Sequence, residues 1–134
     1  MKQEIIVLFS FLLMAGCASK QAINIQKVSD ETAFDSVSYE LIILDSGFES
    51  WYLAHAKPVN YHEQSYYESW NRQYVQAWNN HSLGNRYSQL LDGTIGYDPG
   101  TDYGLEINHK LFYYFMYVEH VLKIPIIPNG PQAW

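Results

Sequence analysis

The chain has 134 residues and a formal net charge of −6, from 14 acidic and 8 basic side chains. This length suits one small domain, and the acidic balance excludes the positively charged surface on which nucleic-acid binding depends. We therefore predict no nucleic-acid partner. The chain has a single cysteine, so no disulfide can form within it and its core must hold the fold.

The first 17 residues resemble the leader of a lipid-modified exported protein. Lys2 precedes an apolar run over residues 5–15, which is shorter than the ~20 residues of a membrane span. The signal peptidase recognition residues are Leu13, Met14, Ala15 and Gly16, and Cys17 follows them. We predict a signal peptide over residues 1–16, with cleavage and lipidation at Cys17. The alternatives are an ordinary secretory signal with an unrelated cysteine, or a short buried helix.

Lipidation would place the protein in the cell envelope. Two or more acyl chains hold a protein stably on a membrane. Ala18, and not Asp, follows Cys17. Because Asp at that position retains lipoproteins at the inner membrane of well-studied Gram-negative bacteria, we expect the outer membrane. Residues 17–37 are predicted to be the lipidated cysteine and a flexible tether with a reach of about 25 Å, which would hold the domain clear of the bilayer.

The predicted globular domain covers residues 38–127. It opens with a short apolar run in residues 39–45, which is typical of a buried strand. Ser46 and Glu49 have the spacing of a capping box and predict a short helix over residues 47–56. That helix should end before Pro58, which disfavours a helical residue ahead of it.

Residues 65–80 predict a long helix with an aromatic face. At 100° per residue, the large apolar side chains fall on one arc. They are Tyr66, Tyr67, Trp70, Tyr74, Ala77 and Trp78. The core is the favoured interpretation of this face, and a ligand platform or a partner surface are the alternatives.

The following segment is rich in glycine and indicates loops, with a short helix or strand near residues 87–91. Asp98 begins a Pro-Gly turn and Asp102 is a candidate N-cap for the next helix. As a calcium loop the segment fails, because Tyr103 replaces the required glycine and His109 replaces the bidentate glutamate. The five histidines are scattered. We predict no metal, no cofactor and no catalytic residues.

The last long helix is predicted over residues 108–123. Its core stripe leaves Phe112, Tyr113 and Met116 on other faces. Either the helix is central and covered on two sides, or these three residues form an exposed patch for a partner. Residues 124–127 could pair as an edge strand with residues 41–44, since proline is tolerated at sheet edges. Residues 128–134 are predicted to be a disordered tail.

Together these elements predict an α+β fold that is mostly helical. Two long aromatic-rich amphipathic helices and one or two short helices would pack with a small two-stranded sheet.

Three motifs also carry a resemblance to a known family. They are YELIILDSGFESW, SYYESWNRQYVQAWN and DYGLEINHKLFYYFMYVE, which with the leader motif resemble an uncharacterised family of small bacterial lipoproteins, the domain of unknown function 6146. The resemblance covers residues 39–122, and the proline-rich end departs from it. It implies a cell-envelope lipoprotein with no assigned activity, cofactor or site residue.

Two functions are carried forward from the sequence. The first is a membrane-anchored, non-catalytic interaction or structural module that docks another envelope protein. The second is a periplasmic glycan or small-ligand binder, because aromatic rings with polar edges suit sugars. Its ligand-facing residues would be Trp51 and Tyr97 beside Asp98 and Asp102. An enzyme ranks third, because no catalytic motif stands out.

Overall fold

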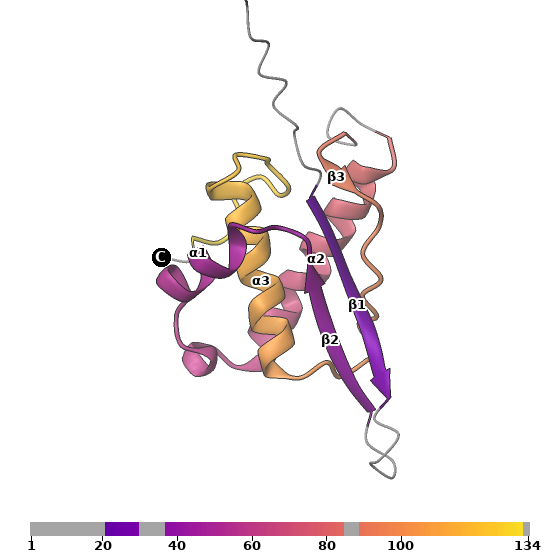
Figure 1. The fold of residues 1–134 in the computed structure, drawn as a ribbon, viewed down its shortest axis with the longest axis vertical. Helices are drawn as coiled ribbons and strands as arrows, with labels where there is room; N and C mark the ends of the chain where they lie inside the picture. The colour runs from indigo at the N-terminus through magenta and orange to yellow at the C-terminus, as the bar shows by residue number, and fades with distance from the viewer. Residues whose placement is uncertain (1–20, 30–36, 85–88, 133–134) are drawn as a thin grey trace, which may run out of the picture.

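The computed structural model describes residues 21–29, 37–84 and 89–132, and within them it is an α+β domain (Figure 1). The elements are β1 (Gln21–Ser29), β2 (Val37–Ile43), α1 (Phe48–His55), the 3₁₀ turn η1 (Val59–Tyr61), α2 (Gln64–Ser82), β3 (Leu91–Asp92) and α3 (Leu105–His120). Cys17 and the four residues before it lie outside the described residues.

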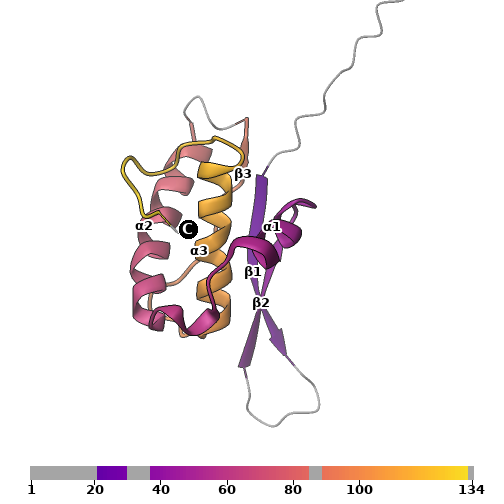
Figure 2. The same ribbon diagram turned by 90° about the vertical axis from the view of Figure 1, so that its left-hand side faces the viewer.

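Helix α3 is the centre of the domain. Figure 2 shows α2 on one side of it and the sheet with α1 on the other. Toward α2, Phe115 stacks on Tyr74 with ring centroids 4.9 Å apart. Toward α1, Tyr114 meets Phe48 edge to face at 5.1 Å. A helix covered on two sides needs apolar residues on nearly all of its faces, as α3 has.

Helices α2 and α3 run parallel. Asn71, in the first half of α2, donates a hydrogen bond to the Asn108 carbonyl near the start of α3. Tyr74, one turn further along α2, donates one to Glu119 near the end of α3. The long segment between the helices therefore has to return along the domain. As a result the C-terminal ends of both helices lie at the same end of the molecule as β3 and the start of β1 (Figures 1 and 2).

The sheet has three strands in the order β2-β1-β3 within the described residues, not the two strands predicted. Strands β1 and β2 are antiparallel, with Ile23 opposite Ile43 and Ile25 opposite Leu41. The start of β1 is parallel to β3. The isoleucines of β1 face the core, where Ile23 is only 6% exposed. Residues 21–29 were expected within the flexible tether, and they form the central strand instead.

The C-terminal segment also differs from expectation. Residues 124–127 do not pair with β2; the amides of Ile126 and Ile127 donate to Glu119 Oε1 at 2.9 and 2.7 Å instead. Prolines at positions 125 and 128 leave few amides for a ladder, and one carboxylate accepts two of them. Residues 128–132, expected to be disordered, have a defined position beside Tyr74 and Glu119.

The helix starts are correct to within a few residues, but their caps are not those predicted. Asp45, and not Ser46, holds the start of α1, because its Oδ1 accepts from the amides of Gly47 and Phe48 at 2.8 and 3.2 Å. Helix α2 begins one residue before Ser65, with no side-chain cap. Helix α3 follows Gly104, which takes φ of 84°, a conformation that favours glycine.

Candidate functional site

The predicted partner patch is part of the core. Phe112, Tyr113 and Met116 are 2%, 2% and 0% exposed. Phe112 packs against Tyr66 and Tyr67 of α2, while Tyr113 packs against α1. The side of α3 that seemed free in the sequence is covered by these two helices, so the three residues offer no exposed surface to a partner.

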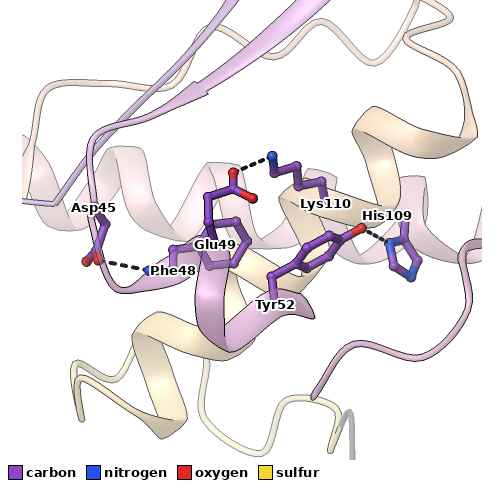
Figure 3. A network of polar contacts seen from close by, with 6 residues as sticks. All are labelled: Asp45, Phe48, Glu49, Tyr52, His109 and Lys110. Carbon is purple, nitrogen blue, oxygen red and sulfur yellow. Dashed lines mark hydrogen bonds and ion pairs between the residues drawn. The ribbon is translucent and has the colours of Figure 1, made fainter. Parts of the chain in front are cut away.

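A buried polar cluster lies between α1 and α3 (Figure 3). His109 is buried in α3, and both of its ring nitrogens have partners. Nε2 lies 2.9 Å from the carbonyl oxygen of Lys57, and Nδ1 lies 2.7 Å from the Tyr52 hydroxyl. A carbonyl can only accept, so Nε2 carries the proton and Nδ1 accepts from Tyr52. Next to them, Tyr113 accepts from the Lys57 amide at 3.0 Å.

The electrostatics keep this cluster neutral. Burial lowers the pKa of His109, although the hydrogen bond to Lys57 opposes the shift. Burial, with a smaller effect of the Glu49 carboxylate, raises the pKa of Tyr52 to about 12. A neutral imidazole with both nitrogens occupied has no free position for a substrate proton. The cluster therefore fastens α1 and the segment after it to α3. At its rim, Lys110 and Glu49 form a surface ion pair of 2.5 Å.

A cleft of about 320 Å³ lies beside this cluster. Lys57, Tyr61, His62, Tyr66, Phe112, Tyr113 and Gln132 line it. His62 stacks on Tyr66 with ring centroids 3.8 Å apart, and the Lys57 ammonium lies 5.9 Å from the centre of the Tyr61 ring. Tyr61 is 59% exposed, so the mouth of this cleft offers an aromatic ring and a cation to solvent.

The structure brings together three of the four predicted ligand-facing residues. Tyr97 stacks on Tyr103 at 5.1 Å, and Tyr103 accepts a hydrogen bond from the amide of Asp98. Asp102 and Tyr103 line a groove of about 590 Å³ between β2 and the start of α3, called the β2–α3 groove below. Its other side includes Tyr39, whose ring meets Tyr103 edge to face at 4.8 Å.

Trp51, the fourth predicted ligand-facing residue, belongs to a different part of the domain. It lies in α1, where it packs on Tyr117 and stacks on His55 with ring centroids 5.2 Å apart. The pairing of Trp51 with Tyr97 in one groove was therefore wrong. Sequence spacing could not exclude it, because the two residues lie on elements whose relative position depends on the fold.

The two predicted aspartates are parts of turns. Asp98 accepts from the Gly100 amide and the Thr101 hydroxyl, each at 2.9 Å. Asp102 accepts from the Gln64 side chain at 2.7 Å and the Gly104 amide at 2.9 Å. These hydrogen bonds lower the pKa of both carboxyl groups. Both side chains are therefore ionised at neutral pH, and much of their hydrogen-bonding capacity is already used.

No group of three or more histidine, cysteine and acidic residues among the described residues could hold a metal ion. No helix in that part of the chain has the length and apolar character of a membrane span.

Sequence reasoning missed the residues that organise the polar interior. Tyr52, His109 and Glu119 were passed over because their partners, which are side chains and backbone groups of other segments, come close only in the folded domain. One signal was available. Asn108 and His109 are adjacent polar residues just before the apolar and aromatic run of residues 111–118, and such residues are buried only when they are hydrogen-bonded.

Similarity to other proteins extends over almost the whole chain. The model of a family of unknown function, DUF6146, matches residues 5–127. The protein is a member of the DUF6146 family. This confirms the resemblance to that family of unknown function, while the lipoprotein character stays a prediction. No curated protein and no solved structure matches the DUF6146 chain.

Proposed function

We propose that this DUF6146 chain is a lipid-anchored protein of the cell envelope, and that its domain is a non-catalytic interaction module. The observation that carries the proposal is the segment from Leu13 to Cys17. Small residues precede the only cysteine, directly after an apolar run too short to span a membrane. We place the anchor in the outer membrane, because Ala18 is not a retention signal for the inner one.

The interior of the domain supports a non-catalytic role. Two ionisable groups of the described interior, His109 and Glu119, are used by the fold. His109 holds α1 and Lys57, and Glu119 accepts from two backbone amides of the C-terminal segment and from the Tyr74 hydroxyl of α2. Each of these groups is satisfied by neighbours from other elements, as expected of structural polar groups.

Metabolic labelling with an alkyne fatty acid, followed by mass spectrometry of the first mature residue, tests the anchor. We expect acyl groups on Cys17 and no label in Cys17→Ser. Membrane fractionation then locates the protein. An unlabelled protein that retains a free thiol would contradict the proposal.

The interaction role has its own test. Crosslinking in cells of a C-terminally tagged protein should recover one envelope protein near stoichiometry, and Cys17→Ala should lose it. Recovery of only non-specific proteins would argue against a docking role, but it would not contradict the proposed lipid anchor.

A second candidate function is the binding of a glycan or another small polar ligand. The β2–α3 groove favours it, because the partly exposed rings of Tyr39 and Tyr103 stand there beside the Asp102 carboxylate. Flat rings with polar edges and a carboxylate suit the faces and hydroxyl groups of sugars. Calorimetric titration with envelope oligosaccharides should show binding that Tyr39→Ala removes and Tyr61→Ala leaves unchanged. The absence of heat with every glycan would end this candidate.

A further inference from the structure

The place where the fold begins restricts how the domain sits on a membrane. Strand β1 starts at Gln21, four residue steps after Cys17. Even a fully extended chain covers only about 14 Å in four steps. If the acyl chains of Cys17 lie in the bilayer, the start of β1 is therefore within about 14 Å of the membrane surface. The long tether expected from the sequence would have allowed any orientation, but this short one does not.

The elements around the start of β1 define one end of the molecule, called the anchor end below. Ala22 accepts a hydrogen bond from Leu44 at 3.2 Å and stands opposite Asp92 of β3. Trp78, in the last turns of α2, donates to the carbonyl of Gly93 just after β3. The C-terminal ends of α2 and α3 lie at this end in both views (Figures 1 and 2).

Exposed apolar side chains occur at the anchor end. Leu44 is 69% exposed beside Ala22, Leu83 is 75% exposed at the end of α2, and Val121 is 43% exposed at the end of α3. Each would leave water if this end rested on the headgroup region. Lys123 is also exposed here, and its long side chain can place an ammonium among lipid phosphates.

Acidic side chains gather at the opposite end. Glu63 and Glu68 stand at the start of α2, and Asp102 and Glu106 at the start of α3. Gln64 bridges the two starts through bonds to Glu68 and Asp102, each 2.7 Å. At the anchor end, the described carboxylates include Asp45 and Asp92, and Lys123 is an exposed cation.

We propose that the domain rests with its anchor end on the lipid surface, where Leu44, Leu83 and Val121 contact the headgroup region. This inference rests on the proposed lipid anchor at Cys17. It leaves the β2–α3 groove and the acidic starts of α2 and α3 facing away from the bilayer, toward soluble ligands or partners.

The single cysteine makes a direct test practical. Lipidation would consume the Cys17 thiol, so an introduced cysteine is the only site for a fluorescent label. We would prepare the lipidated full chain with Leu83→Cys, Leu44→Cys or, as the matched control at the far end, Tyr61→Cys. All three positions are exposed, so labelling should not disturb the core. The 19-residue helix α2 separates Leu83 from Tyr61 by about 28 Å.

The labelled proteins would be placed in phosphatidylcholine vesicles that contain a lipid with a headgroup-level nitroxide. We expect quenching at positions 83 and 44 to be several-fold stronger than at position 61, and aqueous iodide to show the reverse order. Equal and weak lipid quenching at all three positions, in a protein whose acyl groups are verified by mass spectrometry, would overturn the orientation and leave the proposed anchor standing. An unmodified Cys17 would overturn both.

Discussion

At the scale of single residues, the domain depends on buried polar groups whose hydrogen bonds join different elements. His109 is the main example, because it joins α3 to the Tyr52 side chain and to the Lys57 backbone. Breaking such a bond leaves a buried group without a partner, which costs more than the bond itself contributes. Two predictions follow from the geometry and protonation state of this histidine.

Tyr52→Phe should destabilise the domain by about 1–3 kcal/mol, because it leaves Nδ1 of His109 buried without a donor. The loss would appear in urea unfolding at neutral pH. Tyr61→Phe is the matched control, since its side chain is 59% exposed, and it should stay within about 0.5 kcal/mol of the wild type. Equal stability of the two variants would show that the hydrogen bond between Tyr52 and His109 contributes little.

The lowered pKa of His109 predicts a pH dependence of stability. Burial holds the folded-state pKa below the ordinary 6.5, so the unfolded chain takes up the proton first as the pH falls. Stability should therefore be constant, as far as His109 is concerned, above about pH 7. It should fall below pH 6.5, by up to about 1.4 kcal/mol per pH unit until the folded-state pKa is reached.

The check on this prediction is the difference in unfolding free energy between the wild type and His109→Gln, measured from pH 7.5 to pH 5. The difference removes the contributions of carboxyl groups and the other histidines, which both proteins share. The advantage of the wild type should shrink as the pH falls. A difference that is independent of pH would mean that His109 does not titrate differently on folding.

At the scale of elements, the C-terminal segment is joined to α2 and α3 through Tyr74 and Glu119. Tyr74 stacks on Phe115, and its hydroxyl donates to Glu119 at 2.7 Å. A Cβ at position 130 would approach the Tyr74 hydroxyl closer than real Cβ atoms do. Because the tyrosine ring is held on two sides, the segment has to move instead.

Gly130→Ala should therefore lower the free energy of unfolding by about 1–3 kcal/mol, as overpacking does. Gly96→Ala is the control, because a Cβ there meets nothing within 4 Å. Amide hydrogen exchange of Ile126 and Ile127 would show whether the segment loosens, since both amides depend on Glu119. An unchanged exchange rate together with unchanged stability would contradict the packing argument.

The elements that sequence reasoning located are those with a strong periodic pattern. The aromatic arc of α2 and the apolar run of α3 each mark a long helix, and the domain is α+β as expected. Strand β1 was missed although Ile23 and Ile25 alternate with Asn24 and Gln26, because that alternation is short and lies among polar residues. The predicted partner of β2 in the sheet was also wrong, because strand pairing joins segments distant in sequence and the local pattern does not determine it.

Site residues were harder to predict than elements. Tyr97, Asp98 and Asp102 came together because they are neighbours in sequence, whereas Trp51 did not because its position depends on how α1 packs. The exposed patch around Phe112 was inferred from one helix alone. A helical wheel shows which residues share a face, but it cannot show how many neighbouring elements cover that face.

At the scale of the whole molecule, the residue at which the domain begins determines both its stability and its distance from the proposed lipid anchor. The sequence suggested a start near residue 38, whereas the structure adds β1 from Gln21. Strand β1 is central in the sheet and is the only link between β2 and β3 in the described strand order. Its Ile23 side chain is 6% exposed and Ile25 packs against the core.

Two truncated chains test whether the domain starts at Gln21 or near residue 38. A chain that begins at Gln21 should fold like the wild type. A chain that begins at Val37 loses the burial of Ile23, worth about 1.5–3 kcal/mol, and the strand that pairs with β2 in the described sheet. It also uncovers Leu91, which is 1% exposed in the intact domain. Against a typical stability of about 5–15 kcal/mol, these losses together should abolish cooperative unfolding.

Thermal unfolding followed by near-ultraviolet circular dichroism suits this comparison, because the packed tyrosines and tryptophans of α2 and α3 report on the core. The shorter chain should lose that signal while it keeps part of its helical far-ultraviolet signal. If it instead unfolds cooperatively at the temperature of the longer chain, β1 is dispensable. In that case residues 18–36 could act as a tether after all, and the domain would be free to stand away from the membrane. The truncation therefore also bears on the orientation of the anchored protein, since a short link to the bilayer requires β1 to be part of the domain.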